Sequence, residues 1–355
     1  MAGPILPAGT VVSTAALRRV LQYERNDLTV SVESGMPFSE LQALLAKQGQ
    51  MIALDPPLFP QATVGGVIAS NSSGPMRYAF GTARDMVIGM TFATLEGRLV
   101  KTGGMVVKNV AGLDMGKLMI GSFGTLAVIT SVNFRVHSLP AETKTFIFAF
   151  ADLASAIGKR DAVARSVLQP MALDLLSPAA AVRFDRPGFN MRGYVLAVRA
   201  GGSRAVLDRY ERDLQGSEQL SDTAEIDFWQ QVREFTPAFL RRQPSGIVLR
   251  ISTTLSDMAP LLQLISDPCI SRAGSGVTYA YLTNPQGLAP LWTAAAERHW
   301  SAVVEFAPDD FRGGNPLWLE AASPRAPGSF DMMSKVKQMF DPLTLLNRSR
   351  LYGRL

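Results

Sequence analysis

Glycine is concentrated in one part of this chain of 355 residues. Of its 30 glycines, 12 lie between Gly65 and Gly124. Glycine carries no Cβ atom, so it allows a backbone to turn tightly or to pass close to another group. A region so rich in glycine cannot consist of long regular helices or strands. The sequence therefore predicts short elements here, joined by close turns.

The composition is that of a globular protein. Hydrophobic residues make up 47% and charged residues 18%, which excludes global disorder, and the length corresponds to two domains. The single cysteine, Cys269, excludes an internal disulfide framework and a four-thiolate metal or iron–sulfur site. The net charge of +5 suits an anionic ligand or an acidic partner. No basic block or nucleic-acid-binding motif accompanies it, so nucleic acid is not an expected partner.

No segment has the pattern of a signal peptide or of a transmembrane helix. The uncharged run 56–76 is long enough to span a bilayer, but it contains four prolines, a glycine pair and several serine and asparagine residues. We therefore expect a cytoplasmic protein without a transmembrane segment.

Hydrophobic patterning predicts an α+β chain with a change of pattern near Pro140. Before it, we expect strands at 28–33, 51–54, 86–95, 98–101 and 126–136, and helices at 36–48 and 109–119. After it, we expect strands at 146–150, 193–199, 246–253 and 302–306, and helices at 153–168, 205–214, 258–265, 294–300 and 331–340, with a loop at 308–330. The predicted domains are 1–140, 141–330 and a C-terminal segment, 331–355.

The strongest candidate for a binding site is residues 62–74, A-T-V-G-G-V-I-A-S-N-S-S-G. Paired glycines expose consecutive backbone N–H groups, which can cradle a phosphate or a flavin ring. A tight turn with a bulge is the alternative. The segment is not a G-x-G-x-x-G fingerprint, and the chain has no P-loop, so a Rossmann nicotinamide domain and ATP hydrolysis are disfavoured.

Further motifs follow in a fixed order: G-T-A-R-D (81–85), L-E-G-R-L-V (95–100), V-K-N-V-A-G (107–112), G-S-F-G-T-L (121–126) and F-D-P-L-T-L-L-N-R-S-R-L-Y-G-R (340–354). Together they resemble the PCMH-type FAD-binding domain of the vanillyl-alcohol oxidase family, and within it the glycolate oxidase FAD-binding subunits (E subunits). The resemblance implies a two-lobed FAD-binding domain, an α+β cap domain, and a C-terminal helix that returns to the FAD domain. The family's glycine-rich pyrophosphate loop has no counterpart here, so we expect a truncated first lobe.

The resemblance also implies a set of residues around a non-covalently bound FAD. Asp85 has helix capping as an alternative role, and Lys108 has that of a solvated surface charge. The implied cofactor-binding residues are Thr63, Gly65, Gly66, Asn71, Gly74, Gly81, Asp85, Lys108, Asn109, Gly124 and Ile129.

Residues for catalysis are harder to identify. The metal-binding motif H-x-x-G-D-G-N-x-H of related 2-hydroxyacid dehydrogenases is absent, so no metal site is expected. We expect His137 and His299 to be structural or surface residues, and no catalytic base is identified. Three arginines, Arg183, Arg241 and Arg242, could bind a substrate carboxylate, although surface solvation is the more common role.

Three functional hypotheses remain. The leading one is an FAD-binding subunit of a glycolate oxidase complex, in which glycolate is oxidised to glyoxylate together with a metal-bearing flavoprotein subunit and an iron–sulfur subunit. Such a complex could lie peripherally at the inner membrane. The alternatives are a stand-alone flavin-dependent oxidoreductase acting on a 2-hydroxy acid or alcohol, and a non-catalytic assembly subunit that has lost FAD.

Overall fold

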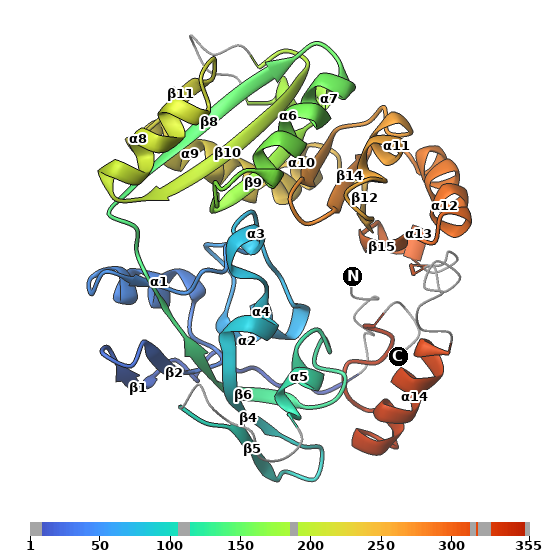
Figure 1. Cartoon of the computed structure of the whole chain (residues 1–355). Helices are drawn as coiled ribbons and strands as arrows, with labels where there is room; N and C mark the ends of the chain where they lie inside the picture. The colour runs from blue at the N-terminus through green and yellow to red at the C-terminus, as the bar shows by residue number, and fades with distance from the viewer. Residues whose placement is uncertain (1–8, 106–113, 185–190, 313–316, 319–327, 352–355) are drawn as a thin grey trace. The chain divides into compact units, whose positions relative to one another are not determined.

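The computed structural model describes residues 9–105, 114–184, 191–312, 317–318 and 328–351 (Figure 1). The chain divides into two compact units. Unit 1 comprises Met1–Gly74, Phe80–Leu139 and Gly328–Leu355, and unit 2 comprises Pro75–Ala79 and Pro140–Pro327. Among the described residues, no helix is long and apolar enough to cross a membrane.

Unit 1 is built on a five-stranded antiparallel sheet with the order β1-β2-β6-β4-β5. A separate two-stranded pair joins β3 to β7. The strands are β1 Val20–Glu24, β2 Thr29–Glu33, β3 Gln50–Met51, β4 Val87–Ala93, β5 Leu99–Gly103, β6 Val128–Arg135 and β7 His137–Ser138.

The alternation in the sequence explains the central strands of this sheet. Val30 and Val32 of β2 are fully buried, and Val132 of β6 lies directly opposite Val32. A turn at 96–97, between the two predicted strands, joins β4 to β5, and the Gly97 N–H donates to the Thr94 carbonyl at 3.0 Å. The strands expected at 28–33, 86–95, 98–101 and 126–136 are thus confirmed within a few residues.

The short helices α2, α4 and α5 pack on this sheet (Figure 1), whereas most of α3 belongs to unit 2. Residues 62–74, which we expected to form a glycine turn, instead have a helical centre, helix α2. The other helices in this part of the chain are α1 Phe38–Ala46, α3 Arg77–Phe80, α4 Ala83–Met86 and α5 Gly116–Met119; α2 is Val64–Ser70, and α14, near the C-terminus, is Ser329–Phe340.

Unit 2 is built on an eight-stranded antiparallel sheet with the order β11-β8-β10-β9-β13-β14-β12-β15. Its strands are β8 Glu142–Phe150, β9 Ala172–Leu176, β10 Tyr194–Gly202, β11 Glu218–Leu220, β12 Ile247–Ser252, β13 Cys269–Arg272, β14 Val277–Leu282 and β15 Ser301–Phe306. Its helices are α6 Leu153–Arg165, α7 Pro178–Ala181, α8 Arg204–Asp213, α9 Asp222–Arg233, α10 Phe235–Arg242, α11 Met258–Gln263, η1 Pro285–Gly287, α12 Leu288–Glu297 and α13 Asp309–Arg312.

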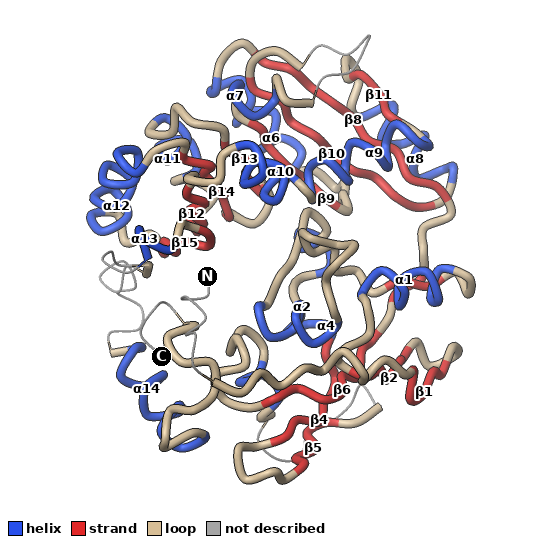
Figure 2. The backbone as a smooth tube through the Cα atoms, turned by 180° about the vertical axis from the view of Figure 1, so that it is seen from behind, coloured by secondary structure: helices blue, strands red, loops and turns tan. Residues whose placement is uncertain are grey.

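The two faces of the eight-stranded sheet carry separate cores. On one face, buried side chains of α6, α8, α11 and α12 pack on the sheet, with Leu173 and Leu175 of β9 among them. On the other face, α7, α9 and α10 pack on neighbouring β9 residues such as Leu176. Figure 2 shows α9 and α10 lying over the strands on this second face. The period-two alternation of side chains along a strand produces this division.

Candidate functional site

Helix α2 forms because its first three backbone N–H groups all have acceptors within the protein. The Val64 N–H donates to the Met36 carbonyl at 2.9 Å, and the Gly65 N–H donates to the Ser34 carbonyl at 2.7 Å. The Gly66 N–H donates to Oγ1 of the N-cap residue Thr63 at 3.2 Å. These amides are therefore already satisfied, so this turn offers a ligand its exposed backbone surface more than its donors.

The paired glycines of α2 have different environments. Gly65 is buried, and a Cβ atom there would lie 2.8 Å from Cβ of Ser34. Gly66 is exposed, and a Cβ atom there would meet only Oγ1 of Thr63, at 3.1 Å. Internal packing thus explains why residue 65 is a glycine, whereas the backbone at Gly66 is open to a neighbouring molecule.

The end of α2 is held against a second glycine turn. Exposed Asn71 ends the helix in the left-handed conformation, with φ of 50°. The Gly121 N–H donates to the Ile68 carbonyl at 3.1 Å, and the Phe123 N–H donates to the Ala69 carbonyl at 2.8 Å. The motifs 62–74 and 121–126, far apart in the sequence, therefore form one continuous backbone surface.

Gly124 completes this second turn. Its φ of +67° favours glycine. A Cβ atom there would also lie 2.6 Å from Nδ2 of Asn347, which donates to the Phe123 carbonyl at 2.7 Å. The C-terminal segment thus packs directly on the turn.

A buried lysine holds this C-terminal segment in place. Nζ of Lys337, on α14, donates to the carbonyls of Thr125 at 2.7 Å and Leu346 at 2.9 Å, and to Oδ2 of Asp341 at 2.6 Å. Burial would raise the pKa of Asp341, but hydrogen bonds from Lys337 and from the backbone of Leu345 and Leu346 outweigh it and lower that pKa. We did not predict this network. Its charged residues, Lys337 and Asp341, are only four positions apart at the end of an otherwise ordinary helix, so the sequence alone does not distinguish them.

The remaining predicted residues have internal roles in the described structure. A Cβ atom at Gly74 would collide with the backbone oxygen of Asp55, and Gly81 has a φ of +81°. Oδ2 of Asp85 accepts hydrogen bonds from the N–H of Thr82 at 2.8 Å and from its hydroxyl at 3.2 Å, so Asp85 caps α4. Ile129 is a buried residue of β6. Lys108 and Asn109 lie outside the described residues.

The surface around α2 fits a flavin cofactor. Gly66 and Asn71 are exposed, and Gly124 is half-buried, so three of the predicted positions leave backbone accessible. Next to Gly65, the buried hydroxyl of Ser34 has no hydrogen-bond partner in the described part of the chain. A flat ligand bound mainly through backbone contacts suits this surface.

Neither histidine belongs to this backbone surface. The ring of His137, in β7, packs edge-on against Phe80 at 5.0 Å between centroids, and burial, with the nearby charge of Arg135, lowers its pKa. His299 is exposed, with φ of 59°, just after α12. In the described ranges, no group of three or more histidine, cysteine, aspartate or glutamate residues is arranged to hold a metal ion.

Unit 2 contains a polar group that we did not predict, hereafter the arginine–tyrosine cluster: Arg77, Arg250, Arg272, Tyr279 and Glu305. Arg250 pairs with Tyr279 across neighbouring strands and forms an ion pair with Glu305 at 2.6 Å. The guanidinium of Arg272 lies 5.5 Å from the centroid of the Tyr279 ring, and it also forms an ion pair with Asp174.

Arg77 joins the cluster from a distant part of the sequence. Burial lowers its pKa, and the charges of Arg250 and Arg272 act in the same direction, while Tyr279 and Glu305 oppose them. Burial also raises the pKa of Tyr279, so its phenol stays protonated and can donate a hydrogen bond. Guanidinium groups beside a phenol can bind a carboxylate and an adjacent hydroxyl.

Comparison with known proteins agrees with this structure. Residues 2–103 match the family model described as FAD binding domain. The solved structure of an alkyldihydroxyacetonephosphate synthase superimposes with a TM-score of 0.66 at 17% sequence identity, over 93% of this chain and 65% of that chain. The matched family model and the fold together indicate an FAD-binding domain of the PCMH-type fold, with FAD as its cofactor.

Two curated relatives are similar to this chain along almost its whole length, and a third over about half of it. Glycolate oxidase subunit GlcE of Escherichia coli (strain K12) is 28% identical over 98% of this chain and 88% of its own length. Glycolate oxidase subunit GlcD of Bacillus subtilis (strain 168) is 24% identical over 98% of this chain and 80% of its own length. A mitochondrial D-lactate dehydrogenase (cytochrome) of Arabidopsis thaliana is 33% identical, but over only 47% of this chain and 29% of its own length. The chain thus resembles the glycolate oxidase subunits over its full span.

Proposed function

We propose that this chain is the FAD-binding subunit of a glycolate oxidase complex, which oxidises the 2-hydroxy acid glycolate to glyoxylate. The similarity to two glycolate oxidase subunits over 98% of the chain is the observation that supports this most directly. The backbone surface around α2 supports the part of the proposal that concerns the cofactor.

In this proposal, unit 1 binds FAD. Gly66, Asn71 and the 121–124 turn would contact it through their backbone, while Lys337 keeps the turn in position from behind. Bound FAD would supply the two-electron oxidation chemistry. Unit 2 would be the cap or interface domain, and residues 331–355 would complete the FAD-binding unit.

The proposal includes partners. No catalytic base or metal site is identified in the described residues, so substrate oxidation would take place with a metal-bearing flavoprotein subunit, and electrons would leave through an iron–sulfur subunit. The FAD of this chain would then relay or store electrons.

Co-expression with the other subunits of the complex tests this proposal. The chain should co-purify with them, carry about one FAD per chain, and be required for glycolate-dependent dye reduction by the assembly. A colourless chain that rejects added FAD, or an assembly equally active without it, would contradict the proposal.

The arginine–tyrosine cluster favours a second candidate, a stand-alone flavin-dependent oxidoreductase for a 2-hydroxy acid. Its guanidinium groups could bind the substrate carboxylate within this chain, without a partner. The isolated, FAD-loaded chain distinguishes the two candidates. Turnover of glycolate or D-lactate that is lost in Arg250→Gln would favour the stand-alone enzyme, and absence of turnover until the partners are added would favour the complex.

A further inference from the structure

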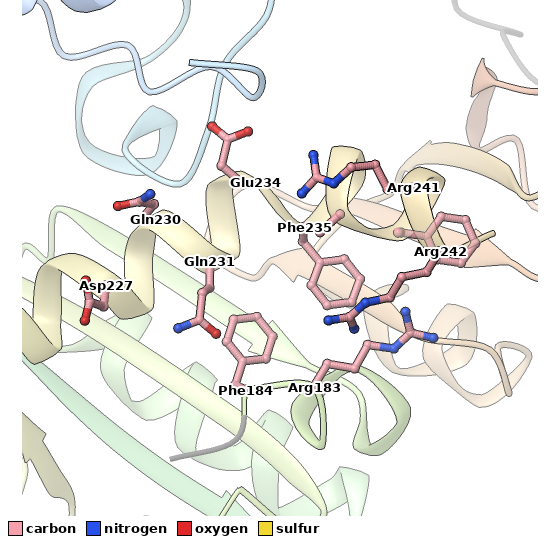
Figure 3. Close-up of a pocket in the computed structure, with 11 residues that line it drawn as sticks. Arg183, Phe184, Asp227, Gln230, Gln231, Glu234, Phe235, Arg241 and Arg242 are labelled. Atoms are coloured by element: carbon pink, nitrogen blue, oxygen red, sulfur yellow. The ribbon is translucent and has the colours of Figure 1, made fainter. Parts of the chain in front are cut away.

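A pocket of about 300 Å³ opens in unit 2 between helices α9 and α10 and the residues that follow α7 (Figure 3). We call it the arginine pocket, after three of its residues: Arg183, Arg241 and Arg242. We identified these three residues from the sequence as possible ligands of a carboxylate, and the structure brings Arg183 to the same pocket as the adjacent pair Arg241 and Arg242. The pocket lies within unit 2 and shares no residue with the arginine–tyrosine cluster.

Aromatic rings form the apolar side of the pocket. Phe184 and Phe235 are buried and stacked, with centroids 5.7 Å apart and an interplanar angle of 10°. The guanidinium of Arg183 lies 5.7 Å from the ring centroids of both Phe235 and Phe239. These aromatic residues belong to the core on that face of the sheet, so the apolar side is rigid.

Positive charge gathers beside these rings. In Figure 3 the side chains of Arg183 and Arg242 extend from opposite sides, with their guanidinium groups next to each other in the view, and the charge of Arg242 acts on Arg183. In the part of the chain that the structure describes, none of the three arginines forms an ion pair. Burial and the charge of Arg242 lower the pKa of Arg183, and Asp267 compensates only in part. Like charges brought together in this way are stabilised by an anion between them.

The size of the pocket limits the kind of anion. Gln230, Gln231 and Asp227 of α9 line another side of it, together with Glu234, which follows α9 and forms an ion pair with Arg233 at 3.2 Å (Figure 3). The volume is at the lower end of the range for ligand pockets, which suits a small organic molecule. A two-carbon hydroxy acid would leave the aromatic rings uncovered.

We propose that the arginine pocket binds a small monocarboxylate with a flat apolar body, its carboxylate between Arg183 and Arg242 and its body along the apolar lining of the pocket beside Phe235. This site does not depend on flavin or on glycolate oxidation. It therefore provides the chain with a ligand-binding function separate from the proposed function.

Benzoate is the probe that tests the proposal, in calorimetric titrations of the purified full chain. Acetate has the charge without the ring, benzyl alcohol has the ring without the charge, and inorganic phosphate is an anion without an apolar body. Benzoate should bind saturably and roughly tenfold more tightly than each of the three, because each control lacks one of the two contacts. Absence of saturable benzoate binding, or phosphate binding as tightly as benzoate, would overturn the proposal.

Variants locate the binding. Arg242→Gln changes an exposed residue and should weaken benzoate binding roughly tenfold, the effect of one charge-assisted hydrogen bond, without lowering the melting temperature. Arg183→Gln should weaken it at least as much. Arg212→Gln, at an exposed arginine of α8 outside the pocket, is the matched control and should bind benzoate normally. Equal weakening in Arg212→Gln and Arg242→Gln would indicate general attraction to a basic surface and would overturn the proposal.

Discussion

The two adjacent glycines of α2 show how the same residue type can be required by packing at one position and lie open at the surface at the next. A side chain at Gly65 would meet Ser34 inside the protein, so loss of FAD in a Gly65 variant could reflect misfolding. A side chain at Gly66 would extend from an exposed position. Gly66 is therefore the position at which cofactor approach can be tested separately from folding.

Gly66→Val should reduce the FAD content per chain severalfold and leave the far-UV circular dichroism unchanged, because the valine covers the open backbone of the α2 turn. Gly158→Val is the matched control, since Gly158 lies in helix α6 with open space around its Cα. FAD content should be read from the absorbance of the purified proteins. Equal FAD content in the two variants would remove Gly66 from the cofactor site.

His137 should make stability depend on pH. Its pKa in the folded protein is lowered from 6.5 by burial first and by Arg135 second. The unfolded chain therefore binds this proton at a higher pH than the folded protein. The stabilisation is complete above about pH 6.5 and is lost as the pH falls through the lower, folded-state pKa.

His137→Phe keeps an aromatic ring beside Phe80 and removes the titration. Urea unfolding of the two proteins above and below pH 6.5 should show a smaller acid-induced loss of the free energy of unfolding in the variant. Parallel losses in both proteins would assign the pH dependence to other groups.

Only part of the candidate site could be predicted from residue patterns. Gly66, Asn71 and Gly124 stand in short motifs with recognisable glycine spacing, so the sequence indicates them directly. The arginine–tyrosine cluster draws its members from positions 77 to 305: strand register brings four of them together, and Arg77 joins them from helix α3. No local pattern encodes such a long-range register, so these residues could not be found from the sequence.

At the scale of elements, strongly periodic segments were predicted and context-dependent ones were not. Strand β6 and helix α6 follow the expected alternation and length. Helix α2 was missed because a glycine pair has low intrinsic helix propensity, while its amides find acceptors in Ser34 and Met36, about 30 positions earlier. Strand β9 is buried on both faces, so it lacks the alternation that would reveal it.

Helix α14 provides the clearest prediction at this scale. Lys337→Met leaves the buried carboxylate of Asp341 without its cation and frees the carbonyls of Thr125 and Leu346, so unit 1 should lose about 3–5 kcal/mol of stability. Chemical denaturation measures the loss. Lys335→Met, at an exposed position of the same helix, should cost little.

A second substitution tests whether the charge pair causes the loss. Adding Asp341→Asn to Lys337→Met removes the unpaired charge and should restore part of the stability. If the double variant is no more stable than Lys337→Met alone, the network contributes through its carbonyl contacts and not through the charge pair.

At the scale of the whole molecule, the two units should unfold as separable transitions. All four tryptophans lie between positions 229 and 318, in unit 2, so tryptophan fluorescence reports that unit alone. Flavin fluorescence should report unit 1. Each unit has its own sheet, so each is expected to unfold cooperatively and independently of the other.

Free FAD in excess should therefore raise the melting temperature of the flavin-reported transition and leave the tryptophan-reported one unchanged, because a ligand stabilises only the unit that binds it. Thermal scans at increasing FAD concentrations measure both. A shift of both transitions by the same amount would show that the chain unfolds as one cooperative body.

The discontinuous makeup of unit 1 has a consequence for synthesis in the cell. Its first stretch leaves the ribosome early, but Lys337 and Asn347, which hold the 121–125 turn, are made only after the whole of unit 2. Unit 2 can complete its eight-stranded sheet while those residues are still being translated. The nascent chain therefore carries a folded unit 2 beside an unfinished unit 1, and FAD loading should follow the synthesis of the segment that contains Lys337 and Asn347.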